Sequence, residues 1–482
     1  MSSNIVSNFT KLNDILLEDR TFFKKHQFET ISFRNDDKFL AELADKIESS
    51  AENTKLPEMY QDGYFSPLGK NLRGLVETLT ARVERAGTYD VSNYVLLTQL
   101  VNAALQSSTK NDAYRAVRSL QGFVDDLYKS FTELLRTKVG RKSLDHKIPP
   151  LVSFVDYIPL EISNLPPMPG TLELEQLRDL VGELGDDFAA GVVCLPPGYK
   201  DRPLLWGIMG HEVMGHYVLT ADREDKWLTN LEEAIYQMIK REYPNDVDDQ
   251  LAALWQFWAE EAASDVCSVL SFGPCAAIGA VSFYTALMPL SNWSKDSKLK
   301  AVYQGEENTH PINVLIPALM CGAIDGLDKL SKKSQYISEL LDIGTACTEA
   351  TTVERIEIVD FGLGARVWDP FRKQPPVNLE RFMSLKVLQD SAFKVGRFIV
   401  TEKFTKLGCP LGSLLSWEDK DQDTANAVAR LLPTDLSLTN LDKLGKWEKR
   451  HLIAGGLITV MREPALYHSV NEALKRFLSK LN

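Results

Sequence analysis

The sequence lacks the features that mark several large classes of protein. It has no dense block of lysine and arginine, and its net charge is −12, so nucleic acid and anionic membranes are not expected as partners. Its six cysteines include no Cys-x-x-Cys pair and lie mostly in apolar runs, which argues against a disulfide framework or a cysteine zinc site. Residues 1–10 are polar and lack the apolar core of a signal peptide. These absences predict a cytoplasmic protein with reduced thiols.

Apolar runs long enough to cross a membrane are also missing. An uncharged stretch lies between Asp265 and Lys295, but Gly273-Pro274 divides it into two shorter pieces and several serines dilute it. A span of the bilayer needs about 20 predominantly apolar residues in one helix. We therefore expect two buried core helices here and no membrane span.

The remaining composition is that of a globular protein. The 482 residues are 44% hydrophobic and 25% charged, and this length supports two or three domains. Apolar residues recur at helical spacing in four early segments, near 36–50, 69–86, 91–108 and 111–137. Helical patterns return near 378–398, 423–432, 445–462 and 465–480, with a possible strand pair near 352–369.

Proline-rich residues 139–170 separate the early helices from the middle of the chain and read as a linker or irregular segment. We predict a mainly α (α+β) fold in three parts. These are an N-terminal helical domain at 1–145, a central domain at 146–330 and a C-terminal helical lobe at 331–482.

The central domain contains the most informative stretch of the chain. Residues 203–219 read PLLWGIMGHEVMGHYVL and predict one helix that begins near Pro203. His211, Glu212 and His216 are its main polar groups. Burying two imidazoles and a carboxylate in an apolar helix is costly unless a partner such as a bound metal satisfies them.

The spacing of the two histidines is unusual. The common zinc motif is His-Glu-x-x-His, whereas His211 and His216 are five residues apart and would point to different sides of a regular α-helix. A one-residue π-bulge would bring both to one metal, and Gly215 would make that distortion easier. The alternative is that two unrelated histidines lie near a glutamate by chance.

A second helix, expected at 251–270, supplies further candidate ligands. Glu261 and Asp265 are four residues apart and share one face. Glu261 can be the third metal ligand, while Asp265 and Glu260 can hydrogen-bond the far nitrogens of the two histidines. The alternative is a solvated acidic edge.

These two motifs resemble those of the gluzincin zinc peptidases. Glu261-Ala-Ala-Ser-Asp265 is similar to the Glu-x-x-x-Asp second helix of thermolysin-like enzymes. His211-Glu212-x-x-x-His216, followed by the pair Glu260-Glu261, resembles the HExxxH motif of dipeptidyl peptidase III. The resemblance covers roughly residues 203–275. It implies a helical metallopeptidase core with a small β element, zinc (Zn²⁺) held by His211, His216 and Glu261, and Glu212 as general base.

Two further segments have candidate roles in such a site. Gly191–Leu195 is a predicted strand, and the resemblance implies an edge strand near this position that pairs with the backbone of a peptide substrate. The alternative is a buried structural strand. His310, at an expected helix start, can steady the oxyanion of a tetrahedral intermediate or can be a capping residue. Weaker candidates for the oxyanion role are Tyr217, Tyr284 and Tyr303.

Together these observations predict a zinc-dependent metallopeptidase that hydrolyses peptide bonds in a peptide or protein substrate. The central domain would then be its zinc-binding catalytic domain. The main alternative is a non-catalytic helical scaffold or interaction protein that retains a degenerate or structural gluzincin metal site. A third interpretation is a di-iron protein, but that site needs Glu-x-x-His pairs, whereas Glu212 and His216 are four residues apart.

Overall fold

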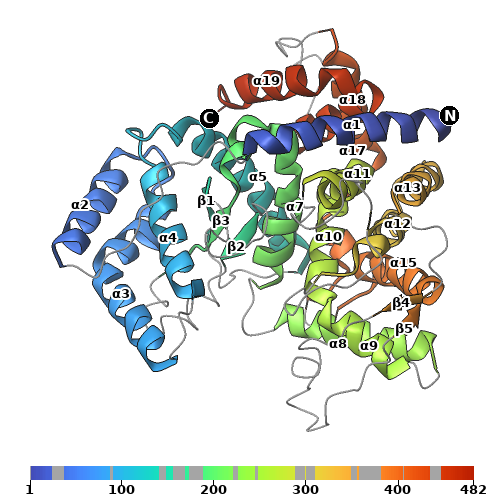
Figure 1. The fold of residues 1–482 in the computed structure, drawn as a ribbon, viewed down its shortest axis with the longest axis horizontal. Helices are drawn as coiled ribbons and strands as arrows, with labels where there is room; N and C mark the ends of the chain where they lie inside the picture. The colour runs from blue at the N-terminus through green and yellow to red at the C-terminus, as the bar shows by residue number, and fades with distance from the viewer. Residues whose placement is uncertain are drawn as a thin grey trace.

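The computed structural model describes most of the chain. The described residues are 2–23, 37–86, 91–139, 148–155, 169–172, 188–220, 226–244, 248–287, 299, 310–348, 355–357, 382–404, 407–434 and 447–481. They form a mainly α-helical protein with a small β element, as the sequence predicts (Figure 1). No helix among these residues is long and apolar enough to cross a membrane.

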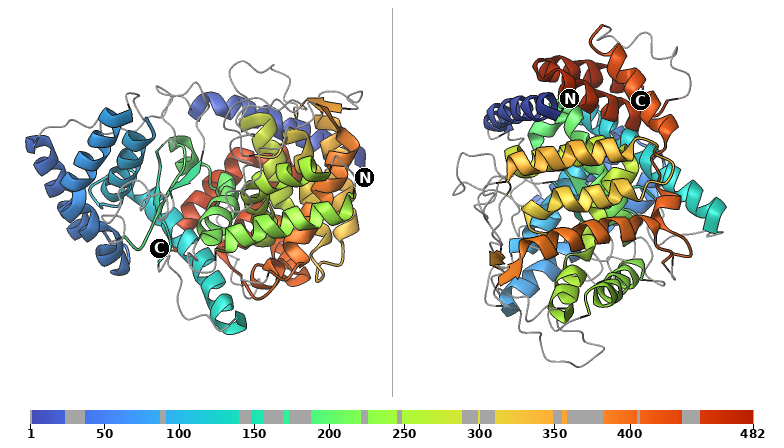
Figure 2. Two further views of the ribbon diagram at one scale, coloured as in Figure 1. Left: turned by 90° about the horizontal axis from the view of Figure 1, so that it is seen from below. Right: turned by 90° about the vertical axis from the view of Figure 1, so that its right-hand side faces the viewer.

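Four of the N-terminal elements lie close to the predicted segments near 36–50, 69–86, 91–108 and 111–137, and the other two lie outside them. The N-terminal elements are α1 (Ser2–Phe23), α2 (Asp37–Asn53), the π-helical turn η1 (Gln61–Phe65), α3 (Ser66–Ala86), α4 (Val91–Gln106) and α5 (Tyr114–Val139). Helices α2, α3 and α4 stand at one end of the molecule, and α1 lies across the opposite part, against α18 (Figures 1 and 2).

A three-stranded sheet separates the two hydrophobic cores. Its strands are β1 (Leu151–Ser153), β2 (Gly170–Leu172) and β3 (Val192–Cys194), in the order β1-β3-β2. Side chains alternate between the two faces of a strand. Leu151, Leu172 and Val192 accordingly pack in the smaller core with α2–α4. Val152 and Val193 face the larger core, which contains the histidine helix.

The position of β3 within the sheet tests the expectation that the strand at Gly191–Leu195 is an edge strand. The predicted strand at Gly191–Leu195 forms, but β3 is central: it pairs in parallel with β1 and antiparallel with β2. Its backbone groups are therefore used inside the sheet, and the expectation of an edge strand there is wrong. The alternative, a buried structural strand, is correct.

The central helices surround the predicted metal motif. They are the 3₁₀ turns η3 (Pro197–Asp201) and η4 (Pro203–Ile208), α7 (Met209–His211), the π-helix η5 (Glu212–Tyr217), α8 (Trp227–Glu242), α9 (Asp248–Phe257), α10 (Ala259–Phe272), α11 (Pro274–Ser282) and the π-helical turn η6 (Phe283–Leu287). The helix expected at 251–270 is thus two helices that meet at Trp258. The described part of the uncharged stretch, up to Leu287, contains the two predicted helices, α10 and α11, divided at Gly273, whose φ is +71°, and ends in η6.

The C-terminal elements complete the larger core. They are η7 (Asn313–Leu315), α12 (Ile316–Asp325), α13 (Lys333–Cys347), β4 (Arg355–Glu357), β5 (Phe382–Ser384), α15 (Leu385–Thr401), α16 (Leu411–Leu414), α17 (Asp419–Leu431), α18 (Lys449–Arg462), η9 (Pro464–Leu466) and α19 (Tyr467–Leu478). Strand β4 lies in the range predicted for a strand pair and is paired with β5. The remainder of that range, 352–354 and 358–369, lies outside the described residues.

The packing groups the chain differently from the predicted three-domain division. Helices α1 and α5, from the first predicted domain, belong to the same continuous core as α10 and α18. The smaller core holds α2–α4 and one face of the sheet. The domain boundaries at 145 and 330 do not coincide with a division between the two cores, and they remain predictions from the sequence. All six cysteines are free thiols, in agreement with the absence of a disulfide framework.

Candidate metal centre

The histidine helix changes its winding where the spacing requires it. The chain from Pro203 is helical but not a regular α-helix: it passes from 3₁₀ turns into one α-helical turn and then into the π-helix η5. The wider i→i+5 turn of a π-helix brings residues five apart onto one side. The π-bulge expected from the His211–His216 spacing is therefore confirmed.

Three ligand atoms converge beside this π-helix. The Nε2 atoms of His211 and His216 are 3.2 Å apart. The Oε2 atom of Glu261 lies 3.2 Å from Nε2 of His211 and 3.3 Å from Nε2 of His216. A tetrahedral zinc ion with bonds of about 2.0–2.1 Å would separate neighbouring ligand atoms by about 3.3–3.4 Å. The spacing of the three ligand atoms is thus compatible with one bound metal ion, and zinc is among the ions that it fits.

Two carboxylates hold the far nitrogen of each histidine. Asp265 Oδ1 lies 3.0 Å from Nδ1 of His211, and Glu260 Oε1 lies 2.7 Å from Nδ1 of His216. When each Nδ1 carries its proton and donates it to a carboxylate, Nε2 keeps its lone pair for a metal. The structure therefore places Asp265 and Glu260 where their predicted orienting role requires them.

Helix α10 reaches the π-helix closely because small residues line their contact. A β carbon added to Gly215 would stand 2.4 Å from the Cα of Ser264. One added to Gly210 would stand 2.6 Å from the Cα of Ser268. Gly215 was expected to ease the distortion of the helix, but its backbone has no positive φ. Its observed contribution is close approach: it lets Glu261 come within reach of both histidines.

The electrostatics of the metal-free cluster depend on charge pairing. Burial alone would lower the pKa of His211, but hydrogen bonds with Asp265 and Glu261 outweigh it and raise the pKa to about 10. Burial likewise opposes a charge on His216, whereas Glu261 and Glu260 raise its pKa well above the ordinary value. Burial would raise the pKa of Glu261, yet the nearby histidines His310, His216 and His211 hold it well below its usual range. The carboxylates therefore favour a positive charge at the cluster formed by His211, His216 and Glu261.

Glu212 occupies the first turn of η5 and is anchored from the sheet. Thr171 Oγ1 donates a hydrogen bond of 2.7 Å to Glu212 Oε2 and also lies 3.1 Å from the Glu212 carbonyl oxygen. Thr171 is paired with Val193 in the sheet, so its side chain faces the larger core and the histidine helix. Both Thr171 and Glu212 are buried. Strand β2 therefore fixes the carboxylate of the predicted general base.

His310 lies beside Glu261. Its Nδ1 atom is 3.2 Å from Glu261 Oε2 and 3.1 Å from the hydroxyl of Tyr284. Its ring is stacked over that of His211, with centroids 5.8 Å apart and planes inclined by 16°. The structure therefore joins Tyr284 and His310 in one hydrogen-bonded pair at the cluster, although 26 residues separate them in the sequence.

Tyr217, another tyrosine predicted for the oxyanion role, does not reach this position. The Tyr217 hydroxyl donates to the carbonyl of Ile148 over 2.8 Å and anchors the end of the π-helix to the segment before β1. Tyr303 lies outside the described residues.

Thr171 is the residue that the sequence reasoning missed. It directly follows the proline-rich segment 139–170, for which the sequence predicts a linker or an irregular segment, and no motif surrounds it. Only the pairing of β2 with β3 shows which way its side chain faces.

Comparisons of the chain with protein-family models, with curated proteins and with solved structures found no match.

Proposed function

We propose that the protein is a zinc-dependent metallopeptidase of the gluzincin type. The observation that supports this most is the triangle formed by His211 Nε2, His216 Nε2 and Glu261 Oε2, with sides of 3.2–3.3 Å. Two histidines and one glutamate are a ligand set of catalytic zinc, which leaves a fourth position for water or substrate. Structural zinc sites normally use four protein ligands, usually with cysteine.

The ion would polarise the scissile carbonyl and lower the pKa of the attacking water. Glu212 would accept the proton of that water and later donate it to the leaving amine. Thr171 supports this role because its hydrogen bond holds the Glu212 carboxylate in one orientation. Asp265 and Glu260 support the ligand role of the histidines by holding each ring at Nδ1.

The pair formed by Tyr284 and His310 is the candidate oxyanion stabiliser. Both groups can donate a hydrogen bond, and both lie at the edge of the ligand cluster. His310 was predicted from the sequence for this role, and the structure adds Tyr284 as its partner. Loss of activity with retained metal in Tyr284→Phe and His310→Ala would support the assignment, whereas full activity would remove it.

The peptide substrate is proposed from the gluzincin resemblance of residues 203–275. The direct test is a peptide-library screen with the zinc-loaded chain, with the chelated protein and Glu212→Gln as controls. Cleavage that disappears in both controls would support the proposal. No cleavage by a zinc-loaded chain would favour the alternative, a scaffold that keeps a structural metal. A cytoplasmic location is likewise proposed from the composition.

A further inference from the structure

Helix α1 places one polar side chain inside the larger core. Phe9, Leu12 and Leu16 lie on its apolar face and are buried in that core. Asn13 lies on the same face, between Leu12 and Leu16, and is 3% exposed. A buried amide has lost its contacts with water, so the hydrogen bond that it makes inside the protein determines where it can sit.

The partner of Asn13 is a threonine of the π-helical turn η6. Asn13 Nδ2 donates to Thr285 Oγ1 over 2.7 Å, although 272 residues separate the two. The Thr285 hydroxyl donates to the carbonyl of Val281, also over 2.7 Å. Because a hydroxyl has one hydrogen, Thr285 accepts from Asn13 and cannot donate to it. The amide nitrogen must therefore face Thr285, and the bond ties α1 to η6.

Thr285 follows Tyr284 directly in the same turn. The Tyr284 hydroxyl lies 3.1 Å from Nδ1 of His310, and this nitrogen lies 3.2 Å from Oε2 of Glu261. A π-helical turn departs from the regular α-helix, so contacts from outside the turn contribute to fixing its shape. The hydrogen bond from Asn13 is such a contact, one residue away from the tyrosine of the candidate oxyanion pair.

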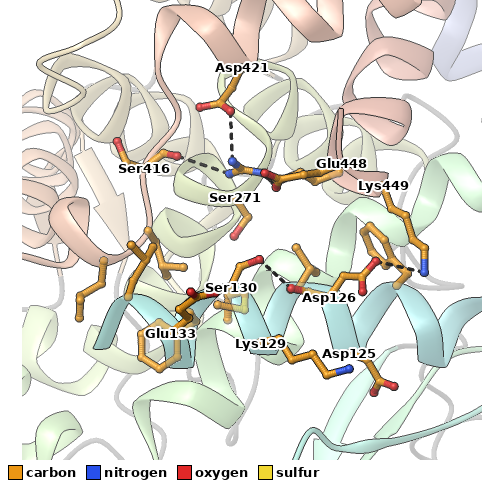
Figure 3. A pocket seen from close by; sticks show the side chains of 18 of the residues that line it. Asp125, Asp126, Lys129, Ser130, Glu133, Ser271, Ser416, Asp421, Glu448 and Lys449 are labelled. Carbon is orange, nitrogen blue, oxygen red and sulfur yellow. Dashed lines mark hydrogen bonds and ion pairs between the residues drawn. The ribbon is translucent and has the colours of Figure 1, made fainter. Parts of the chain in front are cut away.

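The helix that carries the asparagine is itself anchored. Helix α1 packs against α18, and Asn8 donates to the carbonyl of Arg462 at the end of α18 over 3.0 Å. Helix α18 is in turn joined to α5, because Lys449 Nζ lies 3.1 Å from Asp126 Oδ2 (Figure 3). The donor that reaches η6 therefore comes from an element that is fixed elsewhere in the core.

We propose that Asn13 is a positioning residue of the candidate active site. Its hydrogen bond to Thr285 holds η6 so that the Tyr284 hydroxyl meets His310 beside the metal cluster. The effect on turnover rests on the proposed peptidase function. The arrangement of the Tyr284–His310 pair does not, and it can be measured without any turnover.

Three substitutions in the full chain separate the hydrogen bond from packing. Asn13→Leu removes the donor and keeps the branched shape of the side chain on an apolar face. Thr285→Val removes the acceptor from the other side, and Thr285→Ser keeps the hydroxyl. Asn8→Leu is the matched control, because Asn8 is also a hydrogen-bond donor on α1 but its partner belongs to α18. Thermal unfolding checks that each variant is folded.

The first readout is the side-chain NMR signal of His310 in ¹⁵N-histidine-labelled protein. The chain has seven histidines, and the signal that disappears in His310→Ala is assigned to His310. We expect this signal to shift in Tyr284→Phe, in Asn13→Leu and in Thr285→Val, and to stay near its wild-type position in Asn8→Leu and Thr285→Ser.

An unchanged His310 signal in both Asn13→Leu and Thr285→Val would overturn the proposal, whether or not the chain cleaves peptides. A shifted signal in a chain that cleaves no peptide would remove the proposed peptidase function while supporting the positioning of the pair.

The second readout is peptide hydrolysis by the zinc-loaded chain. Asn13→Leu should lower kcat about tenfold with little change in KM, since a small displacement of a catalytic group can cost this much or more. In the Tyr284→Phe background the same substitution should lower kcat no further, because Asn13 acts through Tyr284. An equal fall of kcat in both backgrounds would contradict the positioning role.

Discussion

The Cα of Ser264 lies 2.4 Å from the point where a β carbon on Gly215 would stand. This contact joins the π-helix that carries His216 to the helix that carries Glu261. Because the clash would be with backbone, it cannot be relieved by turning a side chain. The distance between the two metal helices therefore depends on the absence of a side chain at position 215.

Gly215→Ala should separate these helices. We expect a loss of about 1–3 kcal/mol in the free energy of unfolding, the usual cost of overpacking a core, together with weaker zinc binding. Gly279→Ala is the matched control, since a β carbon at Gly279 on α11 meets nothing within 4 Å. Chemical denaturation and zinc titration measure both effects. If Gly215→Ala and Gly279→Ala change the free energy of unfolding and the zinc affinity equally, the contact between Gly215 and Ser264 does not determine the geometry of the metal site.

Thr171→Val should reduce turnover without removing the metal. The substitution removes the hydroxyl that donates to Glu212 Oε2, while the shape of the side chain is preserved. A hydrogen bond to a charged group contributes about 1.5–3 kcal/mol, so kcat should fall by about 10–100-fold while KM changes little. Thr171→Ser keeps the hydroxyl and should retain most activity. A Thr171→Ser variant as impaired as Thr171→Val would mean that packing, and not the hydrogen bond, matters at this position.

Glu212→Gln should separate metal binding from catalysis. The amide keeps the shape of the side chain and can still contact Thr171, but it cannot accept the proton of the attacking water. We expect unchanged zinc content and a fall in kcat of about 10²–10⁴-fold, the usual contribution of a general base. Glu58→Gln, on an exposed side chain far away in the sequence, is the control. An active Glu212→Gln protein would remove Glu212 from the proposed role.

Glu232 on α8 gives a dependence of stability on pH. Burial, reinforced by the nearby charge of Glu260, raises its pKa to about 7. Between its ordinary value of 4.5 and about 7 the folded chain therefore binds more protons at this residue than the unfolded chain does. Its contribution makes the fold less stable as pH rises through this window, and the penalty then persists above about pH 7.

Glu232→Gln removes this titration. In metal-free protein, the melting temperature of Glu232→Gln relative to the wild type should rise between pH 5 and pH 7.5. A constant difference between Glu232→Gln and the wild type across this range would contradict the assignment.

The sequence was informative where a local pattern carries the structure. The α-helical spacing of apolar residues located α2–α5 and α17–α19 to within a few residues. The helix predicted at 378–398 begins only at Leu385, after strand β5, and α16 is not among the predicted helices. The five-residue interval between His211 and His216 predicts a π-bulge if both imidazoles bind one metal, because only a wider turn places them on one side, and the structure has a π-helix there. The four-residue interval from Glu261 to Asp265 placed a ligand and its neighbour on one helical face.

What the sequence could not show depends on contacts between distant segments. Thr171 reaches Glu212 because β2 pairs with β3. A strand of three residues is too short to show a periodicity that would predict this pairing. The central position of Val192–Cys194 in the sheet has the same origin. The pairing of Tyr284 with His310 likewise depends on how the turn η6 meets the segment before η7, 26 residues away in the sequence.

The central claim is that His211, His216 and Glu261 hold one zinc ion. Elemental mass spectrometry on protein purified without added metal tests it most directly, with single alanine variants of these three residues and exposed His468→Ala as the control. We predict roughly one zinc per chain in the wild type and in His468→Ala, and almost none in the three ligand variants. No metal in the wild type, and none taken up when zinc is added, would contradict the account.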